Sequence, residues 1–155
     1  MALLQAGERS REMNIASLIA DRSAADIVSC NVDTLVSEAV SILANQRIGA
    51  LPVMRAGAVA GIVSERDIVY RLASMGSDCL DGPVEAIMTS PVITVEPSTT
   101  VDEALALMTR RRFRHFPVVD NGALCAFISI GDLVKTRIDE VEHEAEALRS
   151  YIQTV

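Results

Sequence analysis

The sequence repeats itself: shifted by 65 residues, it aligns with itself without a gap. Over the 36 positions from 34 to 69, 12 residues are identical to their counterparts. In the first copy these are Thr34, Val36, Glu38, Ala39, Arg47, Pro52, Val53, Gly57, Ala58, Ser64, Asp67 and Val69. A fixed period means that one supersecondary unit occurs twice, and a unit this short cannot bury its apolar face alone. The chain is therefore predicted to fold as two copies that pack against each other.

Both copies predict the same elements. A short strand (27–28 or 92–95) precedes a helix (35–46 or 101–111), an apolar strand containing a proline (50–53 or 115–119), a turn and a third strand (59–63 or 124–128). Because proline cannot donate to a ladder, its strand is expected at a sheet edge, or the proline near the strand start. Ser64 and Ser129 then begin a second helix, with Asp67 and Asp132 in its first turn. The predicted fold class is α/β (α+β), with two β-α-β-β-α repeats packed sheet to sheet about a pseudo-twofold axis.

This pattern divides the chain into an N-terminal extension with a short helix (1–20), repeat one (21–80), repeat two with its preceding linker (81–138) and an amphipathic C-terminal helix (139–155). Either Met1 or Met13 could be the initiator. Apolar residues of the tail recur at alternating spacings of 4 and 3, namely Val134, Ile138, Val141, Ala145, Leu148 and Ile152. This heptad-like stripe predicts a packing surface, either between two copies or within one chain.

Composition narrows the class of function. The chain has 14 Lys+Arg against 21 Asp+Glu, a net charge of −7, and only 3% aromatic residues, which argues against nucleic-acid binding. Cys30, Cys79 and Cys125 form no C-x-x-C pair, so a reducing cytoplasm is expected and no metal site is predicted. No apolar run approaches the ~20 residues that span a bilayer. No catalytic motif is present, so no enzyme is predicted.

A family resemblance rests on two equivalent elements. Ser64-Glu65-Arg66-Asp67 and Ser129-Ile130-Gly131-Asp132, each after an apolar strand, resemble the corresponding elements of tandem cystathionine-β-synthase (CBS) domains. The similarity spans about residues 13–150 and is greatest to small bacterial stand-alone CBS-pair proteins. It implies a regulatory homodimer without a catalytic cofactor. It also implies that AMP, ADP, ATP or NAD binds in the clefts between the copies, as in a sensor of energy state or a signal-transduction protein.

The residues themselves suit such a ligand. A hydroxyl and, three residues later, a carboxylate at a helix start offer acceptors to ribose hydroxyls, while the free N–H groups of the helix can meet phosphate. The resemblance implies two sites. One combines Ser129, Gly131 and Asp132 with Arg114 and His115 at the phosphate and Ile48 and Gly49 at the base. The other combines Ser64, Arg66 and Asp67 with Met88, Ile93 and Phe113, and Arg112 and Arg47 add charge to either. Because arginines are concentrated at 110–114, the Asp132 cleft is expected to be better equipped.

Other interpretations remain open at the level of sequence. Asp67 and Asp132 can serve only the helix dipole, Arg110–Arg114 can be a solvated helix end, and His115 can simply pack beside Phe116. The corresponding functions are a structural dimerisation module without a ligand, or RNA binding through Arg110–Arg114. The downstream protein partner is not indicated.

Overall fold

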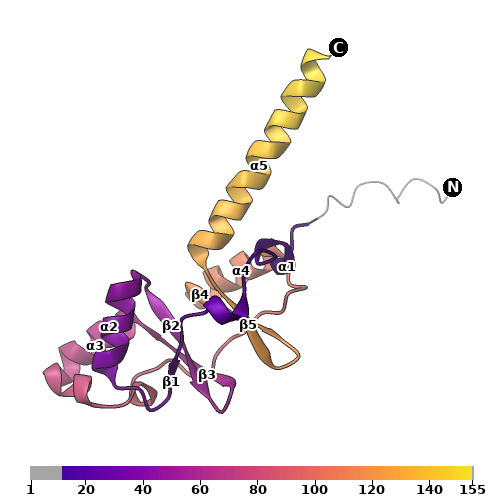
Figure 1. Cartoon of the computed structure of the whole chain (residues 1–155). Helices are drawn as coiled ribbons and strands as arrows, with labels where there is room; N and C mark the ends of the chain where they lie inside the picture. The colour runs from indigo at the N-terminus through magenta and orange to yellow at the C-terminus, as the bar shows by residue number, and fades with distance from the viewer. Residues whose placement is uncertain (1–11, 155) are drawn as a thin grey trace.

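The computed structural model describes residues 12–154 and confirms the mixed α/β fold class, with two small sheets and a long C-terminal helix (Figure 1). The first repeat contains β1 (Cys30–Asn31), α2 (Val36–Gln46), β2 (Ala50–Arg55), β3 (Ala58–Ser64) and α3 (Glu65–Met75). The second contains α4 (Val101–Arg111), β4 (His115–Asp120), β5 (Ala123–Ser129) and α5 (Ile130–Gln153). Outside these lie α1 (Ile15–Leu18) and the short 3₁₀ helices η1 (Ala24–Asp26), η2 (Gly76–Asp81) and η3 (Val84–Ala86).

The two sheets follow the repeat. The first has the order β1-β2-β3 and the second pairs β4 with β5. The antiparallel registers correspond, since Pro52 faces Ile62 and Pro117 faces Phe127. Each hairpin turns through two residues of positive φ, at 48° and 80° in the first copy and 49° and 80° in the second. That conformation favours Gly and Asn, which explains the glycine at the second turn position in both copies.

The first strands differ from their predicted ranges, in position in copy one and in length in copy two. The strand of copy one lies at Cys30–Asn31, rather than at 27–28, and in copy two only Val95 pairs, in a parallel bridge with Val118. The reason is that the parallel pairing of β2 and of β4 involves only residues that follow the proline of that strand. β2 is consequently the middle strand of its sheet, but β1 joins it only from Val53 onward, so the N–H that Pro52 lacks interrupts no ladder.

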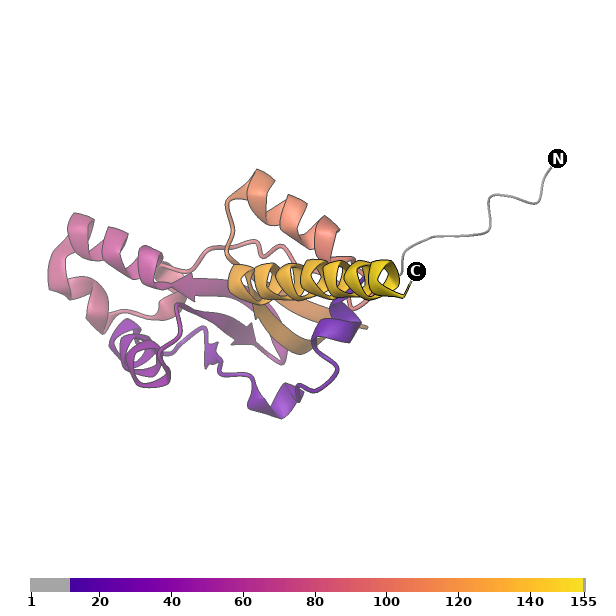
Figure 2. The same ribbon diagram turned by 90° about the horizontal axis from the view of Figure 1, so that it is seen from above.

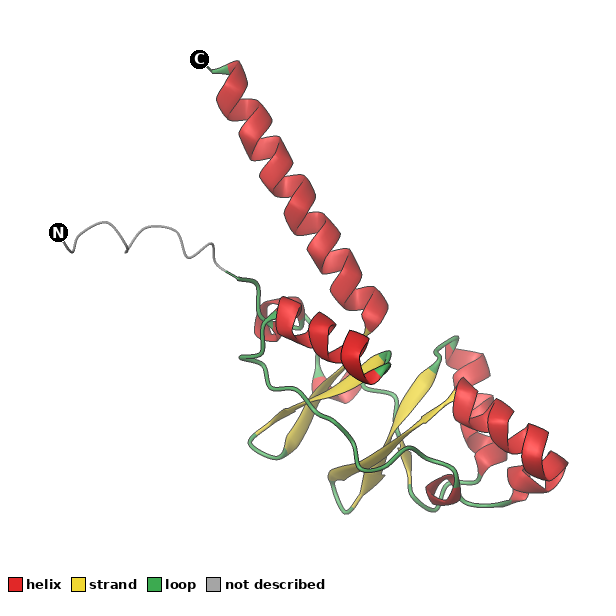
Figure 3. Cartoon of the chain, turned by 180° about the vertical axis from the view of Figure 1, so that it is seen from behind, coloured by secondary structure: helices red, strands yellow, loops and turns green. Residues whose placement is uncertain are grey.

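The segment that precedes each repeat completes the hydrophobic core of the other repeat. Ile15, fully buried, belongs to the core of repeat two, while Val84 and Ile87 belong to that of repeat one. Equivalent backbone bonds fix the two segments: the Ile15 N–H donates to the carbonyl of Thr99 at 2.8 Å, and the Val84 N–H to that of Thr34 at 2.8 Å. We call residues 13–19 and 82–88 the crossed segments. The two sheets lie next to each other, with the helices of each repeat on the outer sides (Figure 3).

The C-terminal helix is continuous. α5 begins directly after β5 and runs to Gln153, so the tail predicted from residue 139 is the extension of the last helix of repeat two. Its first turns contact α4, and the remainder projects from the body of the molecule (Figures 1 and 2). None of the helices between residues 12 and 154 combines the length and apolar composition needed to cross a membrane.

Candidate functional site

Two hollows lie between the repeats and correspond under the 65-residue shift. We call them the Asp67 hollow, of about 300 Å³, and the Asp132 hollow, of about 570 Å³. The first is lined by Gly49, Ile62, Ser64, Glu65, Arg66, Asp67, Thr89, Pro91, Val92, Ile93, Arg112, Phe113, Arg114 and His115. The second is lined by Asp21, Arg22, Ser23, Asp26, Ile27, Val28, Arg47, Ile48, Gly49, Ala50, His115, Ala126, Phe127, Ser129 and Asp132. Each hollow thus combines the helix start of one copy with the helix end of the other.

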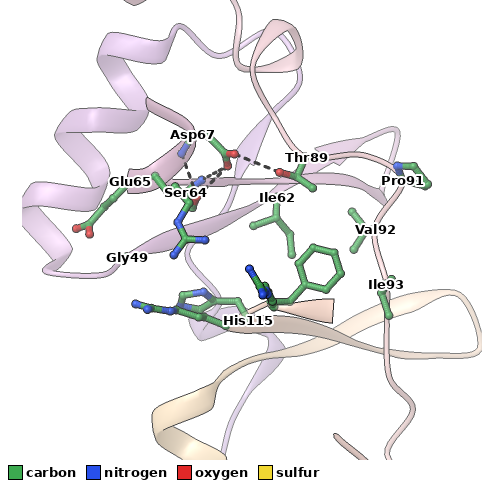
Figure 4. Close-up of a pocket in the computed structure, with 14 residues that line it drawn as sticks. Gly49, Ile62, Ser64, Glu65, Asp67, Thr89, Pro91, Val92, Ile93 and His115 are labelled. Carbon is green, nitrogen blue, oxygen red and sulfur yellow. Dashed lines mark hydrogen bonds between the residues drawn. The ribbon is translucent and has the colours of Figure 1, made fainter. Parts of the chain in front are cut away.

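The start of α3 builds the polar edge of the Asp67 hollow (Figure 4). Ser64 caps the helix, and one oxygen of Asp67 accepts the Ser64 N–H at 2.8 Å and its hydroxyl at 2.9 Å. The other oxygen accepts the hydroxyl of Thr89 at 3.2 Å. These bonds hold the carboxylate at the hollow, where it can accept hydrogen bonds from a sugar.

Positive charge enters the Asp67 hollow from both repeats. Arg66 stands in the first turn of α3, Arg112 ends α4 in a left-handed conformation, and Arg114 directly precedes β4. Three arginines thus face two carboxylates, those of Glu65 and Asp67. Together with the N-terminal turn of α3, this edge suits a phosphate.

An apolar wall faces this charged edge. Ile62 lines the hollow together with Val92, Ile93 and Phe113, which suits a flat base. Met88, expected beside the base, does not line the hollow. It packs on the core of repeat one because Gly61 has no side chain: a Cβ there would lie 2.5 Å from the Met88 sulfur. The next residue, Thr89, lines the hollow instead.

The Asp132 hollow differs in its charge. Its carboxylates are Asp21, Asp26 and Asp132, and its arginines are Arg22 and Arg47. Arg22 already holds Asp132, with its two terminal nitrogens 3.1 and 3.4 Å from the two carboxylate oxygens, and the Ser129 N–H donates to the same group at 2.9 Å. Burial raises the pKa of Asp132, but the hydrogen bonds and charge of Arg22 and the bonds from Ser129 outweigh it and lower the pKa overall.

The structure redistributes the predicted site residues. Ser129, Asp132, His115, Ile48 and Gly49 do line one hollow, and Ser64, Arg66, Asp67, Ile93 and Phe113 the other. Arg114, which was predicted for the Asp132 cleft, lines the Asp67 hollow instead. Gly131 lines neither of the two. Arg112 belongs to the Asp67 hollow and Arg47 to its counterpart. The pseudo-dyad explains this assignment, since the helix end of copy two faces the serine and aspartate of copy one.

His115 and Gly49 line both hollows and form the wall between them. The imidazole stacks on Phe127, with ring centroids 5.4 Å apart and an interplanar angle of 11°. Burial lowers the pKa of His115, and Arg114 lowers it further, while Asp132 and Glu65 oppose the shift.

Sequence reasoning missed some of the lining residues. Val28 and Ile27 line the Asp132 hollow as Ile93 and Val92 line the Asp67 hollow, and the 65-residue shift applied to Ile93 points to Val28. Arg22 carried no such signal, because the crossed segments correspond at a shift of 69 residues rather than 65, and Arg22 lies in the stretch 20–26 that is four residues longer than its equivalent in the second copy. Among residues 12–154, no group of three or more His, Cys, Asp or Glu side chains could hold a metal ion.

Known proteins match nearly the whole described chain. A crystal structure of a CBS-domain-containing protein from Agrobacterium tumefaciens is 38% identical, with a TM-score of 0.76, and the match covers 81% of this chain and 99% of that one. The mitochondrial CBS domain-containing protein CBSX3 of Arabidopsis thaliana is 37% identical over 129 residues, which cover 80% of this chain and 63% of that relative's length. A structure of CBSX2 in complex with AMP is 23% identical, with a TM-score of 0.70 over 82% of this chain and 97% of that one.

The family model of the CBS domain matches residues 19–74 and residues 84–139, one match for each repeat. The predicted resemblance is thereby confirmed: with both of its repeats matched and a solved CBS-domain protein covered almost end to end, this chain belongs to the CBS domain family.

Proposed function

We propose that this protein is a regulatory module that binds an adenine nucleotide (AMP, ADP, ATP or NAD) between its repeats, with the Asp67 hollow as the principal site. One observation carries the proposal: arginines from both repeats, a helix start and a capped carboxylate meet beside an apolar wall. AMP bound to a relative of the same fold supports the ligand class.

Each part of such a ligand has a partner in this hollow. The base packs against Ile62, Ile93 and Phe113, and the ribose hydroxyls donate to Asp67. The phosphates take charge-assisted hydrogen bonds from Arg66, Arg112 and Arg114, which are the strongest kind available at such a site. We assign these residues binding roles and no catalytic role.

The Asp132 hollow is proposed as the weaker phosphate site. This reverses the order expected from the run at Arg110–Arg114, because two members of that run line the Asp67 hollow. Its carboxylates outnumber its arginines, and Arg22 already occupies Asp132, so a nucleotide must displace that ion pair to reach the acid. These carboxylates repel a phosphate but do not repel an uncharged nucleoside.

Regulation follows from binding to two states with different affinity. A nucleotide that joins the arginines of one repeat to the helix start of the other favours the arrangement in which both are close. Because His115 and Gly49 wall both hollows, occupation of one also alters the other. We propose that the functional unit is a cytoplasmic homodimer and that the shift is read by a further protein.

Isothermal titration calorimetry with AMP, ADP, ATP and NAD tests the proposal. We expect binding by the wild type, and a dissociation constant raised about tenfold or more by Arg114→Ala, because a hydrogen bond to a charged group contributes roughly 1.5–3 kcal/mol. The matched control is Arg110→Ala, four residues away at the end of α4 and outside both hollows. Equal affinities for both variants would contradict the assignment of the site.

Two outcomes point to other functions. No heat with any nucleotide, together with an unchanged melting temperature, removes the nucleotide proposal and leaves a structural module, since ligand at 100 times its dissociation constant stabilises a fold by about 2.7 kcal/mol. Strongly salt-dependent RNA binding that is lost in Arg110→Ala revives the basic run as a nucleic-acid contact.

A further inference from the structure

The exposed apolar face of α5 is a surface that the nucleotide proposal does not use. Its residues are Val134, Ile138, Val141, Ala145, Leu148 and Ile152, which we call the α5 stripe. Ala145 is partly buried, and the exposed fractions of the others are 42% for Val134, 51% for Ile138, 51% for Val141, 64% for Leu148 and 72% for Ile152. They follow one side of a helix of 24 residues that projects from the body (Figure 1). Exposed apolar residues aligned in this way indicate a partner surface.

The spacing of the stripe assigns a heptad position to each residue. The steps of 4 and 3 place Ile138, Ala145 and Ile152 at position a and Val134, Val141 and Leu148 at position d. The flanking positions then follow: Lys135, Glu142 and Arg149 at e, and Arg137, Glu144 and Tyr151 at g. In a two-stranded coiled coil, the charges at e and g decide partner and orientation.

A parallel, in-register pair of α5 helices brings opposite charges together. There, each g residue faces the e residue five positions later on the partner. Arg137 therefore meets the partner's Glu142, and Glu144 meets the partner's Arg149. The twofold axis produces each contact twice, so all four flanking pairs between charged residues are attractive.

An antiparallel pair of the same overlap brings like charges together. There, g faces g and e faces e. With the whole stripe overlapped, Glu144 meets the partner's Glu144, Glu142 meets the partner's Glu142, and Lys135 meets the partner's Arg149. All of these are repulsive. The charges of the helix therefore select both the partner and its direction.

We propose that the α5 stripe pairs with the α5 stripe of a second copy in a parallel, in-register coiled coil. Both bodies then lie at the same end of the paired helices, with the axis of the dimer along α5. The inference rests on the proposed function only in giving its homodimer a geometry, and it requires no bound nucleotide. Arg137 also pairs with Glu140 at 3.2 Å and with Asp102 at 3.7 Å in its own chain, so Glu144 and Arg149 are the cleaner pair to test.

Cysteine cross-linking tests the direction. In the parallel pair Ala145 faces the partner's Ala145, so Ala145→Cys is expected to form a disulfide-linked dimer on mild oxidation of the full-length protein. Ser150→Cys, at outward-facing position f of the same helix, is the matched control and is expected to remain uncross-linked. In the antiparallel pair residue 145 faces Val141 of the partner and not the partner's residue 145. Cross-linking of Ala145→Cys that is no greater than that of Ser150→Cys therefore overturns the proposal.

Sedimentation analysis of charge variants tests the pairing energy. Glu144→Arg alone and Arg149→Glu alone are each expected to raise the dimer dissociation constant roughly tenfold, because two pairs change from attraction to repulsion. The double variant restores opposite charges and is expected to recover wild-type dimerisation. Tighter dimers of Arg149→Glu, whose new acid would meet Lys135 in the antiparallel pair, overturn the proposed direction.

A wild type that stays monomeric at micromolar concentration overturns the pairing, and the stripe then packs on another part of the chain or on a different protein. Failure of nucleotide binding in calorimetry leaves these outcomes unchanged, so the two proposals can fail separately.

Discussion

His115 is the titratable residue best placed to sense its surroundings. It forms the wall between the two hollows, lies flat on Phe127, and is charged or neutral according to a balance of neighbours. Burial and Arg114 disfavour the protonated ring, while Asp132 and Glu65 favour it, and the net effect is a lowered pKa. At neutral pH the ring is therefore neutral, and the arginines of the Asp67 hollow carry the positive charge of the site.

Stability is predicted to fall on acidification because of His115. The pKa in the folded protein lies below the ordinary value of 6.5, so the unfolded chain binds the proton first as the pH decreases. The contribution of the neutral imidazole to the free energy of unfolding is complete above pH 6.5. It is lost as the pH falls from there through the lower pKa of the folded protein. Thermal melts at pH 7.5 and pH 5.5 should therefore show a larger loss of melting temperature for the wild type than for His115→Gln. Equal losses for both proteins would show that another group governs this range.

At this scale the sequence predicted residue types better than positions. Ser64 and Asp67 could be found because the repeat and the helix-start pattern mark them, and Ile93 and Phe113 because the family resemblance implies them. Met88 and Arg22 could not be placed correctly, because the position of each depends on contact between segments distant in sequence: Met88 on the space left at Gly61, and Arg22 on an ion pair with Asp132, 110 residues later.

The crossed segments are the elements that join the repeats. The first, which precedes repeat one, enters the core of repeat two, and the second, which precedes repeat two, enters the core of repeat one. An ion pair between Arg55 and Glu85 also holds the second segment on repeat one. Boundaries at residues 20 and 80 follow the repeat, yet buried contacts cross both of them. Periodicity could predict α4 at 101–111 because one face of that helix is buried, but it could not show which core a four-residue helix joins.

Ile15→Ala tests whether the first crossed segment supports the fold. Ile15 is fully buried in the core of repeat two, so its truncation is expected to reduce the free energy of unfolding by about 2–5 kcal/mol. The measurement is urea denaturation followed by circular dichroism. The exposed neighbour Ala16, changed to Ser, is the control and should have a small effect. A loss in Ile15→Ala no larger than in the control would make this segment a dispensable extension.

At the scale of the whole molecule, the crossed segments join the two repeats into one folding unit. The crossed segments tie each core to the other repeat, and β3 contacts β5 where the sheets adjoin. Unfolding of either repeat exposes the apolar residues of the crossed segment that completes its core. The two hollows, which need residues of both repeats, then form and disappear together.

A single cooperative thermal transition is the expected consequence. Differential scanning calorimetry should give one peak with a van't Hoff enthalpy close to the calorimetric enthalpy, about 110 kcal/mol for a chain of this length. Val84→Ala, the counterpart of Ile15→Ala in the other crossed segment, should shift that peak downward as a whole. Two separate peaks, of which Val84→Ala moves only one, would contradict the interdependence of the repeats.

The crossed segments also indicate how a chain with two repeats could arise from a chain with one. A protein carrying only one copy would leave bare the groove that a neighbour's leading segment now fills. Two identical chains of that kind could close both grooves by exchanging these segments, as domain-swapped dimers do. Duplication and fusion of the gene would then convert an exchange of segments between two molecules into contacts within one chain. Each half could diverge in sequence while these contacts were kept.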